Sequence, residues 1–166
     1  PREEGAIQSK LRSGELTPFL EAEAIESAVR RLARELDQDY AARAPVLVGG
    51  LKGGFIFLAD LVRQMQVSVL SVEFLRVSSY GGNTVSSGAP RIEIGLPDHV
   101  VHNRHLLIVE DIVDTGLTTA AVLEYLQEKK PASIKLCVLL EKPDRRRVHT
   151  VIDYLGFTVP DRFLVG

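Results

Sequence analysis

Three carboxylates follow one apolar run closely enough to act on a single ligand. The run Leu106–Val109 leads directly into Glu110 and Asp111, and Asp114 comes shortly afterwards. Adjacent carboxylates at the end of a buried strand repel each other and lose solvation, so they need a cation or hydroxyl donors. The diol of a sugar, or a metal ion held with water, would satisfy both.

Hydroxyl groups and a glycine follow these carboxylates, where a helix is expected to begin. The hydroxyls are those of Thr115, Thr118 and Thr119, and the glycine is Gly116. Hydroxyls and free backbone N–H groups at a helix N-terminus form a site for phosphate. The simpler interpretation is that Asp114 or Thr115 only caps the helix, with Glu110 and Asp111 solvated. A cap explains one polar residue but not the whole cluster, so a binding site is favoured.

Two other polar segments follow apolar runs. Gly49–Gly54 contains Lys52 but lacks the spacing and the Lys-Ser/Thr ending of a P-loop, so nucleotide triphosphate hydrolysis is not supported. On its own it is equally well explained as a plain strand-to-helix turn. Glu141–Arg147 contains Lys142 and three consecutive arginines, a composition most typical of a solvated face.

The elements around these segments predict an α/β fold with a mostly parallel central sheet. Helices are expected over Glu21–Tyr40, Phe55–Met65 and Leu117–Lys130, and strands over Val46–Val48, Val67–Val77, Arg91–Gly95, Leu106–Val109, Ile134–Leu140, Val151–Leu155 and Phe163–Val165. Alternation of helices with continuous apolar strands is typical of a buried parallel sheet. Ligands of such sheets bind beyond the carboxyl ends of the strands, where the three polar segments stand. The glycine-rich stretch Ser78–Pro90 is too long for a hairpin turn and is either a functional loop or a plain connection.

Composition limits the class of protein. The chain has 166 residues, of which 45% are apolar and 25% charged, and we expect residues 1–166 to form a single globular domain. The net charge of -2 disfavours nucleic acid and membrane partners, and no apolar run is long enough to cross a bilayer. The single cysteine, Cys137, stands in an apolar run and is expected to be a buried structural thiol. These features point to a reducing, cytoplasmic compartment.

The segment Val109–Thr119, VEDIVDTGLTT, resembles the binding signature for 5-phosphoribosyl 1-pyrophosphate (PRPP) of type I phosphoribosyltransferases. The signature has two apolar residues, two acids, more apolar residues and then Asp-Thr-Gly-x-Thr, and this form is most similar to the hypoxanthine/guanine members. The resemblance extends from about Pro45 to Gly166. It implies the type I phosphoribosyltransferase fold, in which helices flank a mostly parallel sheet, the chain ends form a small hood and a loop forms a flexible flap.

The resemblance also implies roles for the acidic segment. Glu110 and Asp111 would bind the ribose hydroxyls and help to hold Mg²⁺, and Asp114 would lie beside purine N7 as the acid/base candidate. The turn Asp114–Thr118, with Thr115, Gly116, Leu117 and Thr118, would wrap around the 5′-phosphate. Leu117 stands where some family members have lysine and others have leucine.

The glycine-rich turn and the long loop acquire roles in the same way. The backbone N–H groups of Lys52 and Gly53 would bind pyrophosphate, and the resemblance implies a cis peptide bond between Leu51 and Lys52. Ser79 and Tyr80 match the flap, which would close over the reaction centre and exclude water.

The base would be recognised by the later segments. By resemblance, Lys142 donates to the 6-oxo group, Arg146 lies near pyrophosphate, Phe163 stacks on the purine and Leu164 offers backbone groups to the base edge. A buried ammonium group can only donate, so it accepts a carbonyl oxygen and rejects the 6-amino group of adenine. Without the resemblance, Phe163 is more typical of a core residue.

These features together imply a purine-salvage transferase that joins a 6-oxopurine base to PRPP and releases a purine mononucleotide and pyrophosphate, as a homodimer or homotetramer. One alternative is a PRPP-sensing nucleic-acid regulator on the same fold, with Arg145–Arg147 as part of its surface. Another is a xanthine-preferring transferase, because xanthine shares the 6-oxo group. Family members continue past the Gly166 position with a further metal-binding aspartate, so we expect a C-terminal tail that is missing here.

Overall fold

The computed structural model describes residues 19–78, 90–162 and 164 of the chain. Its helices are α2 (Ala22–Asp39), α3 (Phe55–Gln64), α4 (Asp98–Val101) and α5 (Leu117–Glu128), and a 3-10 turn, η1, spans Pro143–Arg145. Its strands are β1 (Val46–Leu51), β2 (Ser71–Ser78), β3 (Arg91–Ile94), β4 (His105–Val113), β5 (Ser133–Glu141) and β6 (Tyr154–Thr158).

The strands form a single sheet in the order β3-β2-β1-β4-β5-β6. Every neighbouring pair is parallel except β2 and β3, which are antiparallel. The prediction of an α/β fold with a mostly parallel sheet is therefore confirmed.

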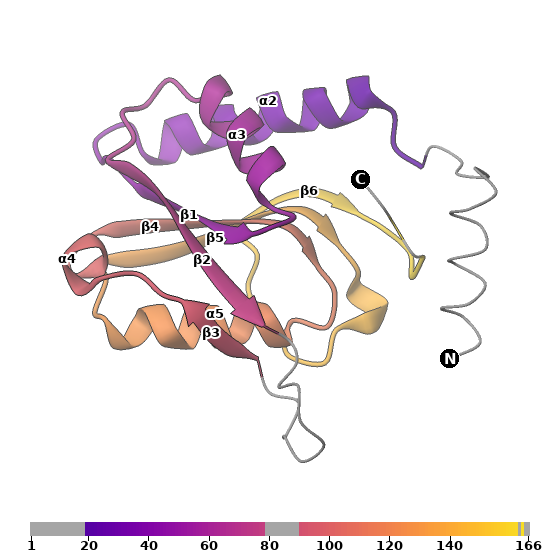
Figure 1. Ribbon diagram of the computed structural model, residues 1–166. Coiled ribbons are helices and arrows are strands. Elements are labelled where there is room, and N and C mark those ends of the chain that lie inside the picture. The colour runs from indigo at the N-terminus through magenta and orange to yellow at the C-terminus, as the bar shows by residue number, and fades with distance from the viewer. Residues whose placement is uncertain (1–18, 79–89, 163, 165–166) are drawn as a thin grey trace, which may run out of the picture.

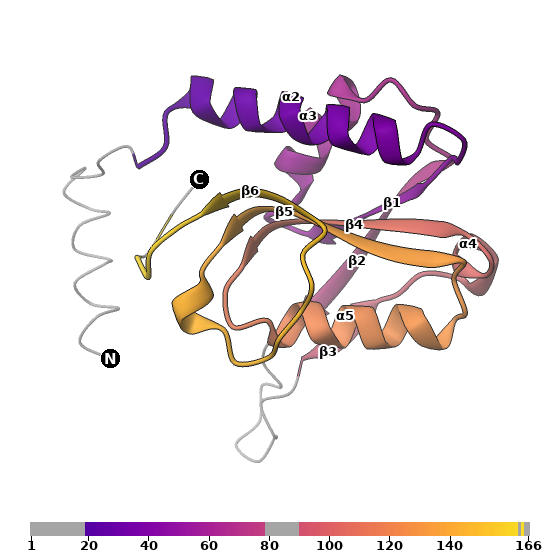
Figure 2. The ribbon, with the colours of Figure 1, turned by 180° about the vertical axis from the view of Figure 1, so that it is seen from behind.

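Helices cover both faces of this sheet (Figures 1 and 2): α2 and α3 lie on one face and α5 on the other. An apolar core fills the space between the sheet and the helices on each face, and successive residues of the central strand β4 point alternately into one core and the other. Leu107 and Val109 pack with α2 and α3, whereas Leu106 and Ile108 pack with α5. Because both faces of β4 are buried, the strand is a continuous apolar run rather than an alternating one.

Some elements differ from the sequence predictions. Strand β4 runs on to Val113, so Glu110 and Asp111 lie on the strand itself and not after it. Helix α4 was not predicted, and the last described strand is Tyr154–Thr158 rather than Val151–Leu155. None of the helices among the described residues is both long and apolar enough to span a bilayer.

Candidate active site

The carboxyl ends of β1, β4 and β5 meet at one edge of the sheet, because the three strands are parallel neighbours. The turn after β1, the turn after β4 and the loop after β5 all leave from this edge. They contain Lys52, Asp114 and Lys142, respectively. The fold therefore brings together three segments that lie far apart in the sequence.

The two adjacent carboxylates lie against the glycines of the first turn. A Cβ atom on Gly50 would come within 2.8 Å of Oε2 of Glu110, and one on Gly53 would overlap Oδ2 of Asp111. The other oxygen of Asp111, Oδ1, accepts a hydrogen bond of 2.9 Å from the backbone N–H of Ile112. The glycines thus allow the backbone of the turn to approach the acids closely. The peptide bond between Leu51 and Lys52 is cis, as the resemblance implies.

Glu110 is poorly solvated. Burial, with a further contribution from the negative charge of Asp111, raises the pKa of Glu110 to about 7. A cation or a hydroxyl donor placed beside the two carboxylates would favour their ionised forms.

Carboxylate oxygens are suitable ligands for Mg²⁺, which usually takes one or two of them and completes its shell with water and substrate phosphates. The described residues contain no group of three or more His, Cys, Asp or Glu side chains arranged to hold a metal ion. Glu110 and Asp111 supply two carboxylates, so the pair fits Mg²⁺ that is bound together with a phosphorylated substrate.

The turn after β4 is shaped by Gly116, which has φ of +80° and precedes α5. A Cβ atom on Gly116 would lie 2.6 Å from the carbonyl oxygen of Val148, so the loop after β5 packs directly on this turn. Two backbone N–H groups of that loop, those of Arg147 and Val148, donate to the carbonyl oxygen of Thr115 at 2.9 and 3.2 Å. The side chain of Thr118 is exposed. The turn thus has a fixed backbone and an accessible hydroxyl at the start of α5, as a phosphate site requires.

Asp114 lies beside Arg145 in the following loop. Nε of Arg145 is 3.0 Å from Oδ1 of Asp114, within ion-pair distance. The Oδ1 atom is buried and accepts no hydrogen bond from the described residues. The Asp114 side chain as a whole is 39% exposed, so the rest of the carboxylate, and not Oδ1, is available to a donor on a bound ligand.

The side chain of Lys142 is buried at the end of β5, with 5% of the residue exposed. Its ammonium group donates to the backbone carbonyl of Arg162, and its backbone N–H donates to the carbonyl of Val113 at 3.0 Å. The ammonium group is thus held at the carboxyl edge, and a backbone carbonyl oxygen accepts its hydrogen bond.

Comparison with known proteins agrees with this geometry. The family model described as the phosphoribosyl transferase domain matches residues 16–166. The chain belongs to the phosphoribosyl transferase family.

Among its relatives within the family, the hypoxanthine-guanine phosphoribosyltransferase of Aquifex aeolicus is 46% identical over 95% of this chain and 88% of its own. The hypoxanthine-guanine phosphoribosyltransferase of Bacillus subtilis is 42% identical over 89% of this chain and 81% of its own. A crystal structure of a hypoxanthine phosphoribosyltransferase from Staphylococcus aureus has a TM-score of 0.80 at 35% identity, covering 92% of this chain and 83% of its own.

Several predicted site residues of this phosphoribosyl transferase meet at the carboxyl edge. They are Lys52, Gly53, Glu110, Asp111, Asp114, Thr115, Gly116, Leu117, Thr118 and Lys142. Ser79, Tyr80 and Phe163 lie outside the described residues, as do most of the predicted flap loop and part of the Phe163–Val165 strand. Leu164 is described as half-buried.

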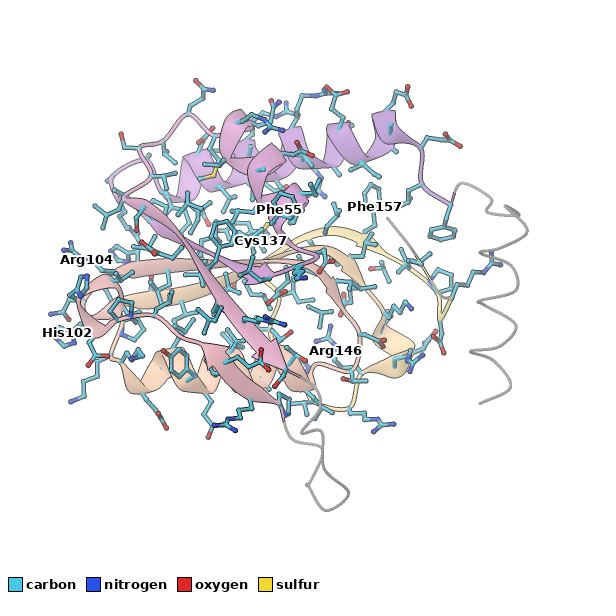
Figure 3. All side chains as sticks on the ribbon, in the orientation of Figure 1. Phe55, His102, Arg104, Cys137, Arg146 and Phe157 are labelled. Atoms are coloured by element: carbon cyan, nitrogen blue, oxygen red, sulfur yellow. The ribbon has the colours of Figure 1, made fainter. Side chains whose placement is uncertain are left out.

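Arg146 has a more enclosed position than its predicted role suggests. Its guanidinium group donates to Oε1 of Glu141 at 2.6 Å and to Oγ1 of Thr150 at 3.1 Å, and 12% of its side chain is exposed. Cδ of Arg146 also lies 3.0 Å from the position that a Cβ on Gly116 would occupy (Arg146 is labelled in Figure 3). Arg146 therefore packs against the turn after β4 and stabilises it. Its contact with pyrophosphate stays a prediction.

Glu141, Thr150 and the pairing of Arg145 with Asp114 are site features that the sequence did not predict. The pair of Arg145 with Asp114 joins the ends of two strands that only the sheet order brings together, whereas Arg146 contacts Glu141, at the end of β5, and Thr150 in the same loop. The many charged residues of Glu141–Arg147 indicate that ion pairs form there, but they do not specify which residues pair.

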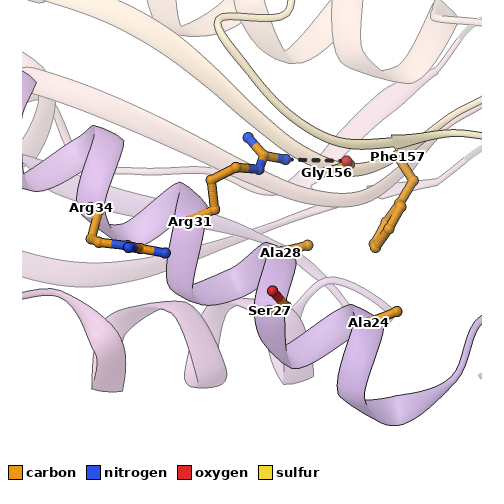
Figure 4. Close-up of a pocket in the computed structure, with 7 residues that line it drawn as sticks. All are labelled: Ala24, Ser27, Ala28, Arg31, Arg34, Gly156 and Phe157. Carbon is orange, nitrogen blue, oxygen red and sulfur yellow. Dashed lines mark hydrogen bonds between the residues drawn. The ribbon is translucent and has the colours of Figure 1, made fainter.

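A separate hollow of about 440 Å³ lies between α2 and β6 (Figure 4). Its lining includes Ser27, Arg31 and Phe157, and none of the predicted site residues. The guanidinium group of Arg31 donates to the carbonyls of Leu155 and Gly156 at 2.7 and 3.2 Å, so it joins α2 to β6. The chemistry-bearing residues lie at the carboxyl edge and not in this hollow.

Proposed function

We propose that this phosphoribosyl transferase transfers the phosphoribosyl group of PRPP to N9 of hypoxanthine or guanine, giving the purine mononucleotide and pyrophosphate in purine salvage. The observation that carries the proposal is the buried ammonium group of Lys142 at the same sheet edge as Asp114 and the turn after β4. This ammonium group can donate to a carbonyl oxygen but cannot accept from an amino group. The relatives named as hypoxanthine-guanine phosphoribosyltransferases support the same substrate class.

In the proposed reaction, N9 of the base attacks the anomeric carbon as the bond to pyrophosphate breaks. Asp114 takes the proton that the base loses at N7, because part of its carboxylate is exposed at the site although Oδ1 is buried. The backbone N–H groups of Lys52 and Gly53 bind the departing pyrophosphate, where negative charge develops. The hydroxyl of Thr118 and the N–H groups at the start of α5 bind the 5′-phosphate.

Glu110 and Asp111 would hold Mg²⁺ and the ribose hydroxyls. Bound Mg²⁺ would help to neutralise the charge of the pyrophosphate group. The raised pKa of Glu110 and its close approach to Gly50, near the end of β1, support this assignment.

The protein acts in the cytoplasm under this proposal. Cys137 is fully buried on β5 (labelled in Figure 3), and burial strongly raises the pKa of its thiol. A buried thiol of this kind is structural and suits a reducing compartment.

A homodimer would use an exposed apolar face that we name the α3–β2 face. It consists of Phe55 and Ile56 on α3, Val72 and Phe74 on β2, and Ile94 on β3. Val72 and Phe74 are two residues apart on β2 and therefore point to the same face of the sheet. Phe74 lies beside Leu58 of α3, because a Cβ on Gly49 would contact both of these side chains. Exposed apolar side chains on neighbouring elements are typical of an interface, and a second copy would cover them symmetrically.

The test is a spectrophotometric assay of the protein with PRPP, Mg²⁺ and each of hypoxanthine, guanine, xanthine and adenine. Turnover of hypoxanthine or guanine, but not adenine, is the expected result. Preference for xanthine would replace the substrate assignment, and PRPP binding without turnover of any base would favour the regulator.

A further inference from the structure

Arg145 lies between two carboxylates that come from different parts of the chain. Its Nε atom is 3.0 Å from Oδ1 of Asp114, and its Nη1 atom is 3.4 Å from Oδ1 of Asp161. Asp114 follows β4, Arg145 belongs to η1 after β5, and Asp161 follows β6. One guanidinium group therefore joins the ends of three neighbouring strands.

The neighbouring cations Lys142 and Arg146 bind other partners. The ammonium group of Lys142 donates to the carbonyl of Arg162, and the guanidinium group of Arg146 is paired with Glu141. Among the described residues, Arg145 is thus the cation paired with Asp114.

Arg145 faces the buried oxygen of Asp114 and leaves the exposed part of the carboxylate free. The 3.0 Å contact between Arg145 and Oδ1 of Asp114 lacks the alignment of a hydrogen bond, and this buried oxygen accepts none from the described residues. The guanidinium group therefore holds the buried side of the carboxylate, and the exposed part stays available to the purine. A general base requires such an orientation before the substrate arrives.

The same arginine reaches the segment that follows β6. Two contacts join this segment to the end of β5: Arg145 with Asp161, and Lys142 with the carbonyl of Arg162. A purine base that accepts the hydrogen bond of Lys142 displaces the carbonyl of Arg162. The contact between Arg145 and Asp161 stays in place. Arg145 can therefore keep the segment near the site while the base is bound.

We propose that Arg145 is a positioning residue that orients the Asp114 carboxylate toward the base and ties the segment around Asp161 to the same site. This inference rests on the proposed function, since it assigns Arg145 a part in the same transfer reaction. Its substitution should affect the use of the purine base and not of PRPP, because neither Asp114 nor Asp161 is among the groups proposed to bind the phosphates, which are the N–H groups of Lys52 and Gly53 and the start of α5 with Thr118.

The experiment compares Arg145→Gln and Arg145→Lys with Arg147→Gln. Arg147 is a matched control, because its exposed side chain makes no ion pair within the described residues and its backbone bond to Thr115 survives substitution. We expect Arg145→Gln to lower kcat/KM for hypoxanthine by about 10- to 100-fold. KM for PRPP and the melting temperature should stay near wild-type values, and Arg145→Lys should restore part of the loss.

A second measurement separates positioning from general stabilisation. If Arg145 acts through Asp114, then adding Arg145→Gln to Asp114→Asn should lower kcat little further. Asp161→Asn alone should raise KM for hypoxanthine and leave kcat largely unchanged.

Equal kinetics for Arg145→Gln and Arg147→Gln would overturn the inference, as would a full additional loss of kcat in the Asp114→Asn background. These outcomes require an active wild-type enzyme, so they leave the proposed function standing. A wild-type protein inactive with every base would instead overturn the proposed function and this inference with it.

Discussion

A side chain on Gly53 would occupy the space of the Asp111 carboxylate, so the turn after β1 and the acidic end of β4 keep their present positions only with glycine here. The backbone N–H of Gly53 is thereby held beside the proposed binding site for Mg²⁺ and ribose. The conformation of Gly53 lies outside the left-handed region, so the requirement for glycine comes from space alone.

Gly53→Ala should therefore weaken PRPP binding by at least about tenfold, since either the turn or Asp111 must move. The same substitution made in an Asp111→Ala background should cause little further loss, because the overlapping carboxylate is gone. KM for PRPP in the four proteins is the measurement. Independent, additive losses would contradict the steric relationship.

Asp114→Asn should retain PRPP binding and lose most turnover. The amide cannot take the N7 proton, and a general base of this kind contributes about 10²–10⁴-fold. Single-turnover kinetics with hypoxanthine, together with a direct PRPP binding measurement, separate the two effects. Turnover equal to wild type would remove Asp114 from the catalytic role.

Lys142→Gln should reduce the preference for 6-oxopurines. The buried ammonium group rejects a 6-amino group, and a polar site of this kind can discriminate by about 10⁴-fold. A neutral amide can both donate and accept, so the ratio of kcat/KM for hypoxanthine to that for adenine should fall by about 10- to 100-fold. Lys130→Gln, at an exposed position beyond the end of α5, is the control. An unchanged ratio in Lys142→Gln would assign base selection to other residues.

The sheet and the acidic segment could be predicted because their signals are local. The apolar run of β4 reflects burial on two faces, and the residues Glu110 to Thr118 carry the family signature within a short stretch. The contacts of Arg145 and Arg146 could not be predicted, because consecutive arginines give no information on which strand end each will face.

The boundary of β2 shows why an apolar pattern can mislead. Val67–Val77 alternates as a strand should, but β2 begins only at Ser71. Val67 and Val69 pack against the core of α2 and α3, and the backbone N–H of Val67 donates to Oδ1 of Asp37 at 3.0 Å. Tertiary packing thus buries the apolar side chains of this segment, and a side-chain acceptor takes the backbone hydrogen bond of Val67, so no neighbouring strand is needed.

Asp39 should make folding stability depend on pH in the acid range. Its carboxylate accepts hydrogen bonds from Lys135 at 2.7 Å and from Tyr154, which hold the pKa of Asp39 below its usual value. A carboxyl whose pKa is lower in the folded state stabilises the protein above the unfolded pKa, near 4, and loses that contribution as pH falls through the folded value.

The stability difference between wild type and Asp39→Asn should therefore be present at pH 7 and disappear in strong acid. It should not exceed about 1 kcal/mol, because the pair with Lys135 is about half exposed. Urea unfolding at pH 7 and at lower pH values measures it, with the exposed Glu124→Gln on α5 as the control. A difference that is independent of pH would contradict the pairing.

The α3–β2 face should mediate dimer formation, and Ile56→Asp should weaken it. Ile56 is 57% exposed in the first turn of α3, where a negative side chain is favourable to the helix dipole, so the monomer should remain stable. A carboxylate buried against a second copy would lack a partner and shift the equilibrium strongly toward monomer. Analytical ultracentrifugation of wild type, Ile56→Asp and the control Val151→Asp, whose position is 68% exposed and outside this face, tests the proposal. A dimer of equal strength in all three proteins would place the interface elsewhere, and a wild-type monomer would exclude the dimer.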